Sequence, residues 1–106
     1  MQPAAKRLEP RTPLKITVDL SSLDIHTLSQ KGVTENVSPR GARVITTKAW
    51  KPNERLVVRS LLGDLRSRAR IVYCERMAAD AYVIGLELYI KAGEWTFPHP
   101  VQQKSA

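Results

Sequence analysis

The sequence RLVVRSLLGDLRSRARIVYCERMAADAYVIGLELYI, residues 55–90, predicts three consecutive β-strands. Residues 55–62 form the first, and a tight turn at Gly63-Asp64 leads into a second over residues 65–76. Residues 77–80 close a hairpin to a third strand over residues 81–90, whose alternate apolar side chains should share one face. These are Tyr82, Ile84, Leu86, Leu88 and Ile90. Gly85 inside this strand predicts a bend or bulge, as a small barrel requires at its corners.

Residues upstream of this region also show patterns that predict β-strands. Residues 14–20 alternate between apolar and polar side chains, which is typical of a half-buried strand. Residues 41–47 (GARVITT) are rich in β-branched side chains and follow a turn signal, so they predict another strand. A weaker segment over residues 25–34 predicts a short strand that ends near Lys31 and Gly32. No segment shows a 3.6-residue period over three turns, so we expect an all-β fold, a small six-stranded antiparallel β-barrel.

The barrel should span residues 14–92, between two segments of different composition. Residues 1–13 are polar, basic and rich in proline, and predict a flexible arm. Residues 93–106 predict a short irregular tail, in which Trp95 and Phe97 pack over one mouth of the barrel. A chain of 106 residues is long enough for one modest core and too short for two.

The charge of the chain is its unusual bulk property. The net charge is +7 and the pI is near 10.0, which favours phosphates, acidic protein or anionic lipid as partners. Cys74 is the single cysteine, which allows no internal disulfide and suits a reducing compartment. Residues 1–6 lack the apolar core of a secretory signal, and no apolar stretch approaches the roughly 20 residues that cross a bilayer. We therefore expect a cytoplasmic protein without membrane insertion.

Enzymatic chemistry has little support in the sequence. His26 and His99 lie far apart and in no spacing used for zinc. Cys74 falls within a strand pattern and has no nearby histidine, so a packed thiol is favoured over a nucleophile. We expect no catalytic residues, no metal and no cofactor.

Three arginines alternate along one predicted strand and should project from one face. These are Arg66, Arg68 and Arg70. They could form a platform for nucleic acid, but no aromatic side chain lies between them to stack on bases. A solvated outer face, which also discourages edge-to-edge pairing, is the favoured interpretation.

Two short motifs carry the functional signal. Arg7 and Arg11 lie four positions apart in a segment that prolines keep from folding as a helix, and Asn36, Ser38 and Gly41 precede an apolar run. Arginine presents a planar fork of donors that matches phosphate oxygens and the O6/N7 edge of guanine. The amide and hydroxyl add compact donors and acceptors, and the glycine lets a ligand approach the backbone. Together they indicate a site for an anionic, guanine-bearing ligand.

Each motif alone has an ordinary structural interpretation. Paired arginines occur by chance in basic chains, and the second motif could be a simple turn, with Asn36 in an Asx-turn and Gly41 at a positive φ. The functional interpretation depends on the order of the motifs, their spacing and the barrel pattern that follows.

In these features the chain resembles the PilZ domain family, bacterial receptors for cyclic di-GMP. That family has an R-x-x-x-R arm followed by a (D/N)-x-S-x-x-G motif that enters a six-stranded antiparallel barrel. The likeness continues through residues 41–44, 69–73 and 84–88, and covers roughly residues 6–90. It implies that Arg7 and Arg11 clamp guanine edges and phosphates. It also implies that Asn36 and Ser38 hydrogen-bond the ligand while Gly41 leaves room beside them.

The resemblance implies a cyclic di-GMP receptor that orders its arm on binding and signals to an effector protein. A PilZ-like barrel with weak or lost ligand binding, acting as a protein-interaction module, is the alternative. A third hypothesis is nucleic-acid binding through the arginines of residues 66–70. The family's frequent C-terminal helix is not expected, because a Trp/Phe/Pro tail takes its place.

Overall fold

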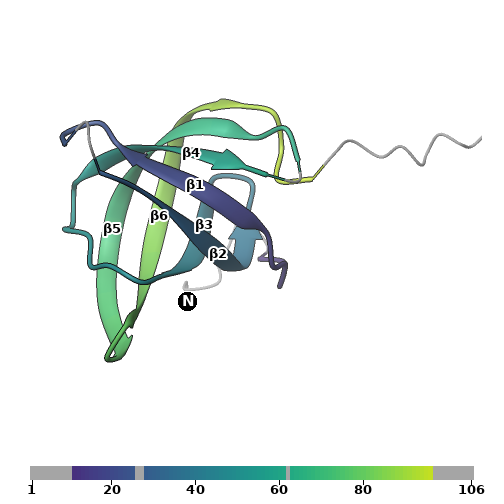
Figure 1. Cartoon of the computed structure of the whole chain (residues 1–106). Coiled ribbons are helices and arrows are strands. Elements are labelled where there is room, and N and C mark those ends of the chain that lie inside the picture. Colours follow the sequence, from purple (N-terminus) through teal and green to yellow (C-terminus); the bar gives the residue numbers. More distant parts are fainter. Residues whose placement is uncertain (1–10, 26–27, 62, 97–106) are drawn as a thin grey trace, which may run out of the picture.

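The computed structural model describes residues 11–25, 28–61 and 63–96, and every regular element in these ranges is a β-strand. The six strands are β1 (Thr17–Ser22), β2 (Ser29–Ser38), β3 (Gly41–Thr46), β4 (Arg55–Ser60), β5 (Arg66–Ala78) and β6 (Ala81–Ala92). Each pairs antiparallel with its neighbours, and the order β1-β2-β3-β6-β5-β4 closes on itself (Figure 1). The six-stranded antiparallel barrel predicted from the sequence is confirmed.

Alternate side chains of the strands fill the inside of the barrel. In β1, for example, Val18 and Leu20 are fully buried while Asp19 between them faces outward. The core consists of Ile16, Val18, Leu20, Val37, Ala42, Val44, Trp50, Leu56, Val58, Leu65, Ala69, Ile71, Ile84, Leu86, Leu88 and Trp95. Because side chains occupy the interior of so small a barrel, its chemistry lies on the outer faces and the loops.

Strand β2 is longer than the sequence predicted. The expectation of a short strand within residues 25–34, ending near Lys31 and Gly32, is wrong, because β2 runs from Ser29 to Ser38. Its sequence, SQKGVTENVS, is polar and has weak strand propensity. The strand forms because β1 pairs with one edge and β3 with the other. Pairing with these neighbouring strands therefore extends β2 as far as the Asn-x-Ser motif.

The end of β6 departs from simple alternation. Leu88 pairs with Ala69 and Ile90 pairs with Arg68, so Tyr89 is the extra residue of a β-bulge. The bulge turns Ile90 to the outer surface, where 61% of it is exposed. The prediction that Ile90 shares the buried face of Leu88 is therefore wrong.

A second bulge in the same strand pair lies beside Gly85, where the sequence predicted an irregularity. The register shifts between Ile71 and Tyr73, which leaves Val72 as the extra residue, and Tyr73 pairs with Gly85. A Cβ added to Gly85 would overlap the ring of Tyr73. The glycine is therefore needed to let the ring lie across the strand.

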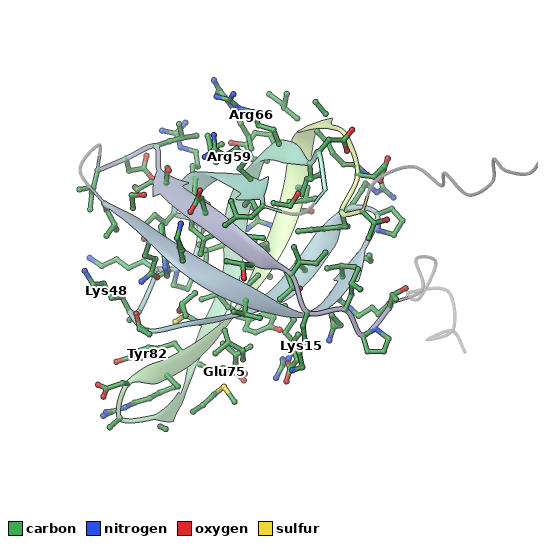
Figure 2. All side chains as sticks on the ribbon, turned by 45° about the vertical axis from the view of Figure 1, so that its right-hand side comes forward. Lys15, Lys48, Arg59, Arg66, Glu75 and Tyr82 are labelled. Carbon is green, nitrogen blue, oxygen red and sulfur yellow. The ribbon has the colours of Figure 1, made fainter. Side chains whose placement is uncertain are left out.

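Strands β5 and β6 form a hairpin that extends beyond the barrel. β5 pairs with β4 only over its first five residues but with β6 as far as Ala78. Figure 1 shows the tip of this hairpin below the rest of the barrel, and Figure 2 labels Glu75 and Tyr82 on it. The connection before β4 bonds to the backbone of Ile71, and in the described part of the chain no strand flanks β5 on that side beyond this point.

Candidate functional site

The second sequence motif forms the hairpin that joins β2 to β3. Ser38 ends β2 and pairs with Gly41 at the start of β3, and Pro39 and Arg40 make a two-residue turn between them. Asn36 lies two residues before Ser38 on the same strand. The three motif residues therefore gather at one end of a single hairpin.

A β-bulge aims Asn36 at the outer surface. Thr34 pairs with Val44 and both are fully buried, whereas Asn36 pairs with Arg43, so Glu35 is the extra residue. Without it, Asn36 would follow Thr34 into the interior, because side chains two positions apart in a regular strand share a face. With it, Asn36 is half-buried and faces outward.

A chain of polar contacts holds this bulge in place. The Nε of Arg43 donates to Glu35 Oε1 at 2.6 Å, and its Nη1 donates to the Tyr73 hydroxyl at 2.8 Å. The hydrogen bond to Glu35, followed by that to Tyr73, raises the pKa of Arg43. These two hydrogen bonds connect strands β2, β3 and β5 next to Asn36. Glu35, Arg43 and Tyr73 were not predicted as site residues from the sequence, because their contacts depend on strand register.

Arg11 is fixed beside the hairpin by its neighbour in the chain. Thr12 forms an isolated bridge with Val37, in which each backbone N–H donates to the other residue's carbonyl. This places the Nη1 of Arg11 2.7 Å from Asn36 Oδ1, to which it donates. Arg7, the other arginine of the first motif, lies outside the described residues.

Gly41 is required by close approach and not by its backbone conformation. Its φ is not positive, since Asn53 and Gly93 are the residues with positive φ in the described part of the chain. A Cβ at Gly41 would lie 2.9 Å from the carbonyl oxygen of Leu86, tighter than an ordinary contact. It would also lie 3.4 Å from Ser38 Oγ and 4.0 Å from Arg11 Nη2. The predicted residues Arg11, Ser38 and Gly41 therefore meet around this point.

Lys91 and Trp95 donate hydrogen bonds to backbone carbonyls at the turn between β2 and β3. The indole Nε1 of Trp95 donates to the carbonyl of Ser38 at 2.8 Å, and Trp95 is buried in the core. Lys91 Nζ donates to the carbonyl of Pro39 at 2.8 Å and pairs with Glu94 at 2.9 Å. The sequence predicts Trp95 over a barrel mouth, but it does not predict the hydrogen bond between Trp95 and the motif. Phe97, its predicted companion, lies outside the described residues.

The cluster offers a consistent set of groups to a ligand. Arg11 is exposed and presents a planar fork of donors, and Asn36 presents a half-buried amide on the same outer face. The hydroxyl of Ser38 belongs to a residue that is only 8% exposed. Gly41 adds a surface without a side chain beside them. These groups suit an anionic ligand with a base edge that can be read by hydrogen bonds.

Two further features of the described residues bear on other functions. No three His, Cys, Asp or Glu side chains in this part of the chain gather where they could hold a metal ion. Within the same ranges there is no helix long and apolar enough to cross a membrane. Cys74 is a free thiol that packs partly against the core, while His26 and His99 lie outside the described residues.

Comparison with known proteins finds a matching protein family and similar solved structures. A sequence model of the PilZ domain matches residues 5–94. The inhibitor of motility (MotI/DgrA) of Bacillus subtilis has a similar structure, with a TM-score of 0.67 and 16% sequence identity over 82% of this chain and 44% of that chain. The PilZ domain of CeSA from a cellulose-synthesizing bacterium gives a TM-score of 0.56 and 25% identity over 76% of this chain and 81% of that chain.

This chain thus spans less than half the length of the motility inhibitor, and at 16% identity that likeness shows the fold alone. No curated protein sequence matches the chain.

Proposed function

The chain belongs to the PilZ domain family, and from this premise we propose that it is a receptor for cyclic di-GMP that orders its N-terminal arm on binding and signals to a partner protein. In this proposal Arg7 and Arg11 clamp the phosphates and guanine edges of the ligand. Asn36 and Ser38 hydrogen-bond it from the hairpin, and Gly41 leaves room beside them. The protein would act in the cytoplasm by binding, without catalysis, metal or cofactor.

The observation that carries the proposal is the meeting of Arg11 with the hairpin motif. These residues are 25 positions apart in sequence, yet Arg11 donates to Asn36 at 2.7 Å. Arg11 of the first motif and Asn36 of the second therefore lie on one surface of this chain, which supports the proposal. A donor fork already placed beside an amide lowers the entropic cost of binding.

The proposed switch is the ordering of the chain that precedes Thr12. Residues 1–13 carry few large apolar side chains, so they gain little from burial on their own. A dianionic ligand held by Asn36 and Ser38 would supply charge-assisted contacts to Arg7 and Arg11. The ordered arm would then change the surface that a partner protein meets.

Calorimetric titration with cyclic di-GMP tests the binding step. Loss of two charge-assisted hydrogen bonds in Arg11→Ala should cost about 3 kcal/mol, or roughly a hundredfold in Kd. Lys15→Ala is the matched control, because Lys15 is an exposed cation near the arm but outside both motifs. Its affinity should stay within about threefold of wild type. Unchanged binding in the double variant Arg7→Ala/Arg11→Ala would refute the assignment.

Hydrogen exchange tests the ordering step. The Thr12 amide already donates to Val37, so it should be protected with and without ligand. Amides before Thr12 should gain protection when cyclic di-GMP is added, while those of β6 change little. Equal protection of these amides in both states would rule out the switch, even if the ligand binds.

One observation favours a second candidate, a PilZ barrel with weak or lost ligand binding that serves as a protein-interaction module. The Asn36 side-chain oxygen and one Arg11 nitrogen already satisfy each other. A ligand must keep or replace that bond, and replacing it reduces the net gain from the new contacts. A wild-type titration without heat or saturation would select this candidate.

A further inference from the structure

The outer face of β4 and β5 concentrates arginines in an arrangement that costs stability. Arg55 pairs directly with Arg70, and Arg59 with Arg66, across the two strands. Arg68 lies between these pairs. Like charges directly opposite each other in a sheet repel and destabilise it. Figure 2 labels Arg59 and Arg66 near the top of the barrel, across the molecule from Lys15. We call these five residues the arginine face.

Carboxylates balance only part of this charge. Arg55 pairs with Asp24 at 2.8 Å, Arg59 with Asp19 at 3.2 Å, and Arg70 with Glu87 at 2.7 Å. The remaining two members, Arg66 and Arg68, are exposed and have no carboxylate partner among the residues that the structure describes. Two uncompensated guanidinium groups therefore stand beside each other on β5.

Exposed apolar side chains lie next to these two arginines. The bulge at Tyr89 turns Ile90 outward directly opposite Arg68, with 61% of Ile90 and 47% of Tyr89 exposed. Tyrosine and arginine together with an exposed aliphatic side chain are the composition of protein–protein hot spots.

The face is also hollowed. A depression of about 350 Å³ lies where β1, β2, β4 and β5 come together at the surface. Its lining residues are Asp19, Ser21, Ser29, Val57, Arg59 and Arg66. The depression gives a partner side chain a place to enter between Arg66 and the hydroxyls of Ser21 and Ser29.

The strand order places the arginine face away from the hairpin motif. In the closed order β1-β2-β3-β6-β5-β4, the seam between β2 and β3 is diametrically opposite the seam between β5 and β4. Arg66 and Arg68 therefore lie away from residues 36–41. Tyr89 and Ile90 lie nearer to them, because their neighbours Leu88 and Lys91 donate to carbonyls of the residue 38–41 hairpin.

We infer that the arginine face, together with Tyr89 and Ile90, docks an acidic segment of a partner protein, whose carboxylates pair with Arg66 and Arg68 and whose apolar side chain packs on Ile90. A nucleic acid fits the face less well. Tyr89 alone gives no platform on which successive bases could stack, whereas the exposed aliphatic side chain of Ile90 suits a peptide. The inference takes from the proposed function only the existence of a partner, and it does not require cyclic di-GMP.

Nuclear magnetic resonance titration tests the inference with a defined probe, a synthetic ten-residue peptide of alternating glutamate and leucine. Saturable shifts are expected for the amides of residues 66–68 and 89–90. Arg68→Glu should weaken peptide binding by about tenfold or more. Arg76→Glu is the matched control, because it makes the same charge change on the same strand, near the tip of the projecting hairpin. It should change the affinity by less than about threefold. Ile90→Ser should weaken peptide binding at both low and high salt, because salt does not screen the apolar contact that this substitution removes.

Four results would overturn the inference. They are equal binding of a peptide with lysine in place of glutamate, preferential binding of a single-stranded oligonucleotide at this face, self-association of the chain through the face, and no binding of the acidic peptide. A parallel titration of Arg68→Glu with cyclic di-GMP separates the two proposals, because the ligand affinity should equal that of wild type. A wild-type chain that fails to bind cyclic di-GMP would refute the proposed function and leave the peptide result unaffected.

Discussion

Replacing Gly41 with alanine tests whether close approach, and not backbone conformation, explains the glycine of the hairpin motif. The new Cβ would lie 2.9 Å from the carbonyl oxygen of Leu86, about 0.5 Å nearer than an ordinary contact. That oxygen belongs to the backbone of β6 and cannot rotate away, so the strands must separate slightly. Overpacking of this kind costs about 1–3 kcal/mol.

The assay is thermal unfolding combined with calorimetric titration of cyclic di-GMP. In a domain of this size each kcal/mol lowers the Tm by about 4–8 °C, so Gly41→Ala should melt at least about 4 °C below wild type. Gly41→Val should lower the Tm further and also remove measurable binding, because its branches extend toward Ser38 and Arg11. Gly32→Ala is the control: it crowds the Val44 side chain in the core, so it should lower the Tm without changing the affinity of the folded protein.

Two outcomes would refute this account of Gly41. An unchanged Tm in Gly41→Ala would mean that the strands yield without cost at this point. A Gly41→Val variant that binds cyclic di-GMP as wild type does would place the ligand site elsewhere.

Three further predictions concern single contacts. Arg11→Ala should lower stability by less than about 1 kcal/mol, since its bond to Asn36 is exposed, and denaturant unfolding measures this. Trp95→Phe removes the N–H that donates to a turn carbonyl and should cost about 1–3 kcal/mol in the same assay. A hydrogen bond from Lys31 lowers the pKa of Asp19 in the folded state below its unfolded value, so this carboxylate stabilises the fold above about pH 4 and loses that effect as pH falls through the folded pKa. Asp19→Asn should therefore be less stable than wild type at pH 7, and the difference should shrink as the pH falls below about 4. A difference that stays constant with pH would contradict the linkage.

The sequence alone predicts the fold class because hydrophobic alternation is a local property of each strand. Alternate apolar side chains within residues 14–20 and 82–88 share one face whatever their neighbours are, and the structure buries Val18, Leu20, Ile84, Leu86 and Leu88. Val83, at an intervening position, is buried as well. Part of the candidate site can also be located from the sequence, because Asn36, Ser38 and Gly41 lie close together along one hairpin. The meeting of Arg11 with Asn36 agrees with the order of the motifs, although ligand binding stays a prediction.

What the sequence could not show depends on register and on distant pairing. A bulge at Tyr89 reverses the direction of Ile90, and only the partner strand decides where that bulge lies. The full length of β2 depends on pairing along both of its edges, which its own polar residues do not reveal. The Trp95 indole reaches the Ser38 carbonyl across 57 positions, a separation that no local pattern encodes.

The hairpin that projects from the barrel has a consequence for how the protein behaves at high concentration. Closing the barrel removes free strand edges, but residues 72–78 of β5 lie beyond β4 and pair with β6 on one side only, as far as the described residues show. Such an edge is a template for intermolecular sheet growth, and Met77 on it is 55% exposed. The adjacent charges of Glu75 and Arg76 oppose this growth, since an added strand would have to bury them. Colloidal stability of this basic domain should therefore depend on two surface charges at the hairpin more than on the free energy of unfolding of the barrel.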